Sequence, residues 1–179
     1  MNASVSAADL AALESQLGRP ARGVLAVAAR CVCGNPTVVR TAPRLPDGTP
    51  FPTLYYLTHP GAVAAVSTLE ATGTMKAMQE RLGTDPELAA AYRAAHESYL
   101  AERCAIDDVP EIHGISAGGM PDRVKCLHVL AGHALAVGPG VNPLGDETLE
   151  LIRDRWRPDR CTCPEPGIGG WGGADSVDA

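Results

Sequence analysis

Residues 23–41 read GVLAVAARCVCGNPTVVRT, and this stretch decides the fold. Two apolar runs, at 23–30 and 36–41, lie on either side of the turn-forming pair Gly-Asn. Apolar runs around such a turn predict a β-hairpin, and they place Cys31 and Cys33 at its turn. The alanines of the first run are also compatible with a helix.

A third strand is expected at 54–58, where the sequence LYYLT is rich in strand-forming residues. Apolar spacing and capping residues predict helices over most of the remaining chain. Their expected ranges are 7–17, 60–72, 74–82, 87–104, 121–137 and 147–156. Together these elements predict an α+β fold, with a small antiparallel sheet of about three strands packed against five to six helices.

The expected domain organisation is a single globular unit over residues 1–157. Residues 158–179 form a tail rich in Gly, Pro and Asp, and this composition predicts disorder. The 179 residues suit one domain, and the hydrophobic fraction of 45% is enough to build a core.

Charge and composition exclude several classes of function. The formal net charge is −6 and only 4% of residues are aromatic, so general nucleic-acid binding by a basic or base-stacking surface is not expected. No apolar run approaches the roughly 20 residues of a membrane span. The first residues, MNASVSAADL, lack the basic and apolar regions of a signal peptide, so we expect a cytoplasmic protein.

Six cysteines and five histidines carry the main chemical signal. In a reducing compartment, spaced cysteines more often bind metal, do redox chemistry or lie buried than form disulfides. Four of them form two C-x-C pairs, one at 31–33 and one at 161–163. This spacing differs from the C-x-x-C of zinc ribbons. The second pair lies in the tail and is interpreted as incidental.

A metal site is the first functional hypothesis. On the helix expected at 121–137, Cys126 and His133 share a face, whereas His128 points about 200° away from Cys126. The hairpin turn and the end of the third strand are expected to complete the site. The predicted ligands are Cys31, His59, Cys126, His128 and His133. Thiolate and imidazole ligands suit zinc, and six cysteines keep an iron–sulfur cluster open. The alternative is structural, with Cys126 a small buried apolar residue and His133 a core histidine.

A metal-free enzyme is the second hypothesis, because a Gly-rich stretch at 116–125 precedes the expected helix. Backbone N–H groups at a helix N-terminus favour an anionic substrate. A thiol near that end has a lowered pKa, so Cys126 would be the nucleophile, with His128 or His59 as the base. The expected anion-binding residues are Arg44, Gly118, Gly119, Arg123 and Lys125. The alternative is an ordinary loop that needs glycine for its backbone conformation.

A protein-interaction module is the third hypothesis, with an acidic surface, the Ala-rich helix at 87–104 and the C-terminal tail as the binding elements. The sequence does not define a reaction, so it leaves open whether the protein is an enzyme. It also leaves the identity of a protein partner open.

Three long strings in the sequence resemble a known family. They are TAPRLPDGTPFPTLYYLTHP at 41–60, SAGGMPDRVKCLHVLAGHALA at 116–136 and GPGVNPLGDE at 138–147, with the pair RC at 30–31. In these strings the chain closely resembles the bacterial domain-of-unknown-function family 501, which is frequent in actinobacteria. The resemblance covers about residues 8–155 and implies a small intracellular bacterial protein with no settled role. It assigns no activity and no catalytic or ligand residue.

Overall fold

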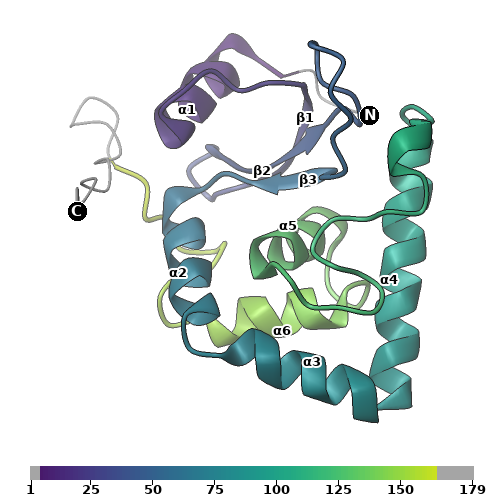
Figure 1. Ribbon diagram of the computed structural model, residues 1–179. Helices are drawn as coiled ribbons and strands as arrows, with labels where there is room; N and C mark the ends of the chain where they lie inside the picture. The colour runs from purple at the N-terminus through teal and green to yellow at the C-terminus, as the bar shows by residue number, and fades with distance from the viewer. Residues whose placement is uncertain (1–4, 165–179) are drawn as a thin grey trace, which may run out of the picture.

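The computed structural model describes residues 5–164 and shows the expected α+β fold. Three antiparallel strands form one sheet in the order β1-β2-β3: β1 (Val24–Arg30), β2 (Pro36–Thr41) and β3 (Tyr55–Leu57). Figure 1 shows α1 (Ala7–Leu17) on one side of this sheet and the other helices on the opposite side. The prediction of a small sheet covered by helices is therefore confirmed.

The hairpin of β1 and β2 forms as expected, with a tight turn at residues 31–35. The Cys31 N–H donates to the Asn35 carbonyl at 2.9 Å, and the Gly34 N–H donates to the Cys31 carbonyl at 2.8 Å. Gly34 adopts a φ of 93°, which residues with a side chain rarely adopt. Arg30 braces the turn, because its guanidinium donates to the Gly34 carbonyl at 2.9 Å and pairs with Asp9 of α1 at 2.6 Å.

Helix α5 (Leu127–Val137) is the centre of the core, between the sheet and α6 (Pro143–Leu151). Leu127, Leu130 and Ala131 are completely buried. Two glycines permit the close packing of this helix. A Cβ at Gly132 would lie 3.2 Å from the Tyr55 carbonyl oxygen of β3, and a Cβ at Gly145 of α6 would lie 2.3 Å from the Leu130 carbonyl oxygen.

Gly145→Ala should lower the free energy of unfolding by about 2–3 kcal/mol, because the added methyl group would force α5 and α6 apart. Gly83 is the matched control, since it is also helical but has no atom within 4 Å of an added Cβ. Gly83→Ala should leave stability unchanged or raise it by up to about 1 kcal/mol. Urea denaturation of both variants measures the difference, and equal stabilities would contradict the proposed packing.

The remaining helices frame this core. They are α2 (Pro60–Glu70), α3 (Thr74–Thr84), α4 (Pro86–Cys104) and the short 3-10 helix η1 (Pro110–Ile112). Helix α4 runs along one side of the molecule and α2 along the other (Figure 1). Among residues 5–164, no helix combines the length and apolar character needed to cross a membrane.

Two predicted helices have wrong bounds. The helix expected from residue 121 begins at Leu127, because the preceding loop turns back on itself. In that loop Gly118 and Gly119 have φ values of 77° and 94°, and the Lys125 N–H donates to the Gly118 carbonyl at 2.8 Å. The last helix spans Pro143–Leu151 rather than 147–156, because the Asn142 side chain caps it by accepting from the backbone N–H of residue 145.

Candidate metal centre

Two distant parts of the chain bring four cysteines together. The hairpin turn supplies Cys31 and Cys33, and the segment after α6 supplies Cys161 and Cys163. All four sulfurs lie within 4.8 Å of one another, and the Cys33 and Cys163 sulfurs are 3.4 Å apart. Figure 1 shows the C-terminal segment passing beside α2 toward the sheet. The arrangement is a four-thiol cluster with room for a single metal ion.

The C-terminal segment reaches the hairpin by packing on the start of α2. The Trp156 side chain is 2% exposed, and its ring centroid lies 5.4 Å from that of His59. Gly61 makes this approach possible. A Cβ at that position would lie 2.7 Å from Thr162 Oγ1 and 3.1 Å from Trp156 Cδ1. Trp156 is therefore packed against the start of α2 and Cys163 is half-buried, whereas residues 157–162 between them are exposed. The rest of the predicted disordered tail, residues 165–179, lies outside the described residues.

His59 lies beside the cluster and is oriented toward it. Its Nδ1 accepts a hydrogen bond from the Ala62 N–H at 3.4 Å, and its Nε2 lies 3.3 Å from the Cys163 sulfur. Burial lowers the pKa of His59, which favours the neutral ring. A neutral ring that accepts at Nδ1 carries its hydrogen on Nε2, so His59 donates toward the sulfur. In this arrangement the imidazole supports a ligand rather than being one.

Burial and neighbouring groups set the acidity of the thiols. Burial raises the pKa of Cys31 and of Cys163. Burial also acts to raise the pKa of Cys33, but hydrogen bonds from the Asn35 backbone and the Cys163 side chain outweigh it and lower that pKa. The pKa shifts therefore make the Cys33 thiol easier to ionise than usual, and the Cys31 and Cys163 thiols harder to ionise. A bound metal ion supplies positive charge that favours the ionised thiols.

The five ligands predicted from the sequence do not form one site. Cys31 belongs to the four-cysteine cluster and His59 lies beside it. Cys126 and His128 lie in a second cluster with Glu70. His133 is completely buried in the core, where its ring stacks on Tyr55 at 5.8 Å and its Nδ1 lies 3.2 Å from Asn142 Nδ2. For His133 the structure agrees with the alternative of a core histidine.

Cys161 and Cys163, interpreted as incidental, supply half of the four-cysteine cluster. One sequence pattern could have identified these two cysteines as ligands. They repeat the C-x-C pattern of the hairpin turn, and a repeated pair is what a four-ligand site requires.

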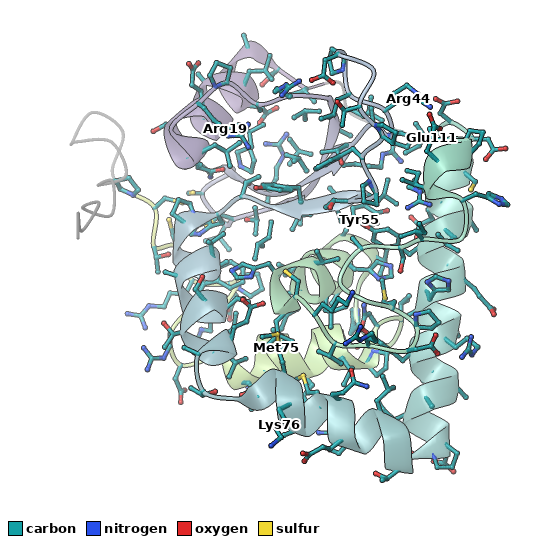
Figure 2. The ribbon with its side chains drawn as sticks, viewed as in Figure 1. Arg19, Arg44, Tyr55, Met75, Lys76 and Glu111 are labelled. Atoms are coloured by element: carbon teal, nitrogen blue, oxygen red, sulfur yellow. The ribbon has the colours of Figure 1, made fainter. Side chains whose placement is uncertain are left out.

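The predicted anion site does not form at a helix N-terminus. The first N–H of α5, that of Leu127, donates to Glu70 Oε1 at 2.6 Å, so the protein's own carboxylate occupies this position. Arg44 pairs with Glu111 through two hydrogen bonds of 2.9 and 2.7 Å. Figure 2 shows the two residues next to each other. Arg123 and Lys125 lie in the loop before α5 rather than in its first turn.

The two glycines of the predicted anion site pack against neighbouring groups. A Cβ at Gly119 would lie 2.7 Å from the Arg123 carbonyl oxygen, and a Cβ at Gly118 would lie 3.2 Å from side-chain atoms of Leu130 and Val129. These contacts support the structural alternative for residues 116–125, a loop that needs glycine for its conformation and for close packing.

The predicted nucleophile and base lie close together. The Cys126 sulfur is 3.9 Å from His128 Nδ1. Burial acts to raise the pKa of Cys126, but the contact with His128 and the Val129 N–H outweigh it, so that pKa is lowered. The contact with Cys126 raises the pKa of His128, and the charge of Glu70 adds to this effect. Sequence analysis missed Glu70, because it comes from a different helix.

The fold and the cluster define a small α+β protein with a four-cysteine site between its hairpin turn and its C-terminal segment. The model of the family described as "Protein of unknown function (DUF501)" matches residues 27–150, more than two-thirds of the chain. The chain therefore belongs to this family. Neither the curated proteins nor the solved structures contain a match. The matched segment includes the hairpin cysteines and ends before Cys161.

Proposed function

We propose that the protein is a zinc-binding protein whose four cysteines hold one structural Zn²⁺. The observation that carries this proposal is the mutual approach of the four sulfurs to within 4.8 Å. Zinc bound by four thiolates has Zn–S distances of about 2.3 Å in a tetrahedron, which places the sulfurs about 3.8 Å apart. Small side-chain adjustments convert the observed cluster into such a site.

The spacing of the sulfurs supports a single ion over an iron–sulfur cluster. The four cysteines of an iron–sulfur cluster are divided between two or four iron atoms, so sulfurs on different irons lie farther apart than ligands of one ion. A tetrahedral set of four thiolates is the typical environment of structural zinc. His59 would supply the outer hydrogen bond that commonly orients a metal ligand.

A closed set of four protein ligands leaves no position for substrate, so the proposed role of the ion is structural. It would fasten the C-terminal segment to the hairpin turn, beside α2. The packing of Trp156 and of Thr162 near Gly61 supports this role, because it already brings the segment to the cluster. The metal–thiolate bonds would then add to the packing of Trp156 against α2 in holding the C-terminal segment in place.

Elemental analysis of protein purified under reducing conditions tests the proposal. The double variant Cys33→Ala/Cys163→Ala should hold one zinc fewer per chain than the wild type. Cys104→Ala is the matched control, because Cys104 is exposed at the end of α4 and lies outside both clusters. It should keep the wild-type metal content.

An unchanged zinc content in the double variant would overturn the proposal. Iron in place of zinc, with visible absorbance, would also overturn it. So would intact mass measured without reductant that shows a Cys33–Cys163 disulfide and no metal. Cobalt substitution gives an independent reading, since four thiolates produce intense sulfur-to-cobalt absorption that should be much weaker in the double variant.

A further inference from the structure

A second cluster of ligating side chains lies at the junction of α2 and α5. Glu70 is the last residue of α2, Cys126 is the N-cap of α5, and His128 lies in the first turn of α5. His128 Nδ1 is 3.2 Å from Glu70 Oε1 and 3.9 Å from the Cys126 sulfur. One atom from each side chain lies within 4.8 Å of the other two. These three residue types are common zinc ligands.

The conformation at the start of α5 brings the thiol and the imidazole together. Cys126 is extended, with φ −155° and ψ 110°, so it precedes the helix. Inside a continuous helix, residues two apart point to opposite faces. The extended N-cap removes this constraint and directs the Cys126 sulfur toward His128.

Surrounding hydrogen bonds hold two of the three side chains in a metal-binding orientation. His128 Nε2 lies 3.2 Å from the Val63 carbonyl oxygen and 3.1 Å from the Ser67 hydroxyl. Because the carbonyl can only accept, Nε2 carries a hydrogen, and Nδ1 is the nitrogen that faces the cluster. Glu70 Oε1 accepts from the Leu127 N–H at 2.6 Å. Metal-binding histidines and carboxylates typically have such outer partners.

The same geometry does not fit a catalytic triad. In a triad the nucleophile and the carboxylate bind opposite nitrogens of the imidazole. Here Glu70 and Cys126 both approach Nδ1 of His128, and a backbone carbonyl takes Nε2. Two acidic side chains that converge on one nitrogen lone pair enclose a position for a cation.

The cluster opens onto a groove of about 800 Å³. Cys126 and His128 line it together with Tyr56, Pro60 and Val63. Among the described residues, its lining contains no Asp, Glu, Lys or Arg. The groove therefore suits an uncharged ligand, and it lacks the basic groups that a phosphate or carboxylate ligand would require.

We propose that Glu70, Cys126 and His128 bind a second zinc ion, whose open fourth position faces the groove. Three protein ligands and one exchangeable position are the pattern of zinc sites that bind substrate. The ligand that fits the groove is an uncharged molecule that offers a neutral oxygen or nitrogen donor to the ion. This site shares no residue with the four-cysteine centre and goes beyond the function proposed for it.

Metal counting separates the two sites. After equilibration with zinc and removal of unbound metal, the wild type should hold two ions per chain, and Cys126→Ala/His128→Ala should hold one. Cys104→Ala should again hold two. An unchanged metal content in Cys126→Ala/His128→Ala would overturn the second site and leave Glu70 and His128 as an ion pair. The variant Cys33→Ala/Cys163→Ala reports on the other centre, so failure of one proposal is visible without the other.

Imidazole, used as a neutral probe, tests the open position. The cobalt-loaded wild type minus the cobalt-loaded Cys126→Ala/His128→Ala variant gives the absorption of the second site alone. Adding imidazole should shift this difference spectrum, and the spectrum of the variant should stay unchanged because its remaining site is closed. A difference spectrum that does not respond to imidazole would show a closed site and overturn the proposal. Both proteins keep the four-cysteine centre, so the comparison does not depend on removing it.

Discussion

Arg103→Met should lower the free energy of unfolding by about 4 kcal/mol, because it removes three hydrogen bonds that a buried, charged side chain donates to backbone carbonyls. Arg103 lies near the end of α4 and its side chain is 2% exposed. Its guanidinium donates to the carbonyls of Pro52 at 3.2 Å, Ile115 at 2.5 Å and Ile112 at 2.7 Å. One side chain thus joins α4 to the loop before β3 and to the segment around η1.

Methionine is the informative replacement because it keeps most of the volume and removes every donor. The matched control is Arg93→Met on the same helix. Arg93 pairs with Asp122, but the two side chains are 57% and 74% exposed, so the loss should stay within about 0.5 kcal/mol. Urea denaturation at pH 7 measures both variants. Similar losses in the two would show that Arg103 contributes only as an ordinary surface charge.

Lowering the pH from 7 to 4 should remove about 3 kcal/mol of stability through His133 alone. The ring is completely buried, and burial lowers its pKa from 6.5 to about 4. The charges of Glu102 and Asp146 act in the opposite direction. Asn142 Nδ2 donates to Nδ1, so the single hydrogen lies on Nε2, which has no hydrogen-bond partner among residues 5–164. The site therefore holds a neutral ring and has no acceptor placed for a second proton.

Acid lowers the free energy of unfolding because the pKa of His133 is lower in the folded protein than in the unfolded chain. Between pH 6.5 and 4 the unfolded chain binds a proton at His133 and the folded protein does not, so acid favours unfolding. Stability is retained above pH 6.5 and is lost progressively as the pH falls toward 4.

His133→Phe isolates this contribution, because phenylalanine keeps an aromatic ring beside Tyr55 and Tyr99 and does not titrate. Denaturation at pH 7, 6, 5 and 4 should show a smaller fall for the variant, by about 3 kcal/mol over the whole range. Acid also protonates thiolates and releases bound metal, but it does so in both proteins, so the difference belongs to His133. Parallel pH profiles would contradict the prediction.

The sheet could be predicted from the sequence because its signals are local. The apolar runs of β1 and β2 and the Gly34-Asn35 turn lie within one short stretch of sequence. The sequence also allowed a helix at 23–30, but in the structure this segment forms a strand that pairs with β2. For example, Val27 of β1 pairs with Val39 of β2. Cross-strand pairs of β-branched residues stabilise the sheet, and the alanines between them do not prevent strand formation.

The start of α5 could not be placed from composition, because proline commonly begins a helix and Pro121 suggested that it does so here. The glycine turn before it instead delays the helix to Leu127. This shift decides the chemistry of Cys126. Placed inside a helix, Cys126 points away from His128, whereas as an extended N-cap it lies 3.9 Å from that ring.

The pairing of the two C-x-C motifs depends on tertiary structure. Nothing close to Cys161 in the sequence indicates that it lies beside Cys31. The contact arises because Trp156, in the segment after α6, packs against His59 and Gly61 at the start of α2, and the chain then continues to the hairpin. A composition rich in Gly and Pro predicts disorder for such a segment, but a few specific contacts suffice to position its first residues.

The four-cysteine cluster also has a consequence for the order in which the protein is made. Cys31 and Cys33 leave the ribosome early, whereas Cys161 and Cys163 emerge only after every helix and strand described here. The hairpin cysteines therefore cannot complete the cluster until residues 161–163 have been synthesised. A chain interrupted before residue 161 would contain every helix and strand described here and yet lack the cluster. The four-thiol cluster thus forms only after synthesis has passed residue 163.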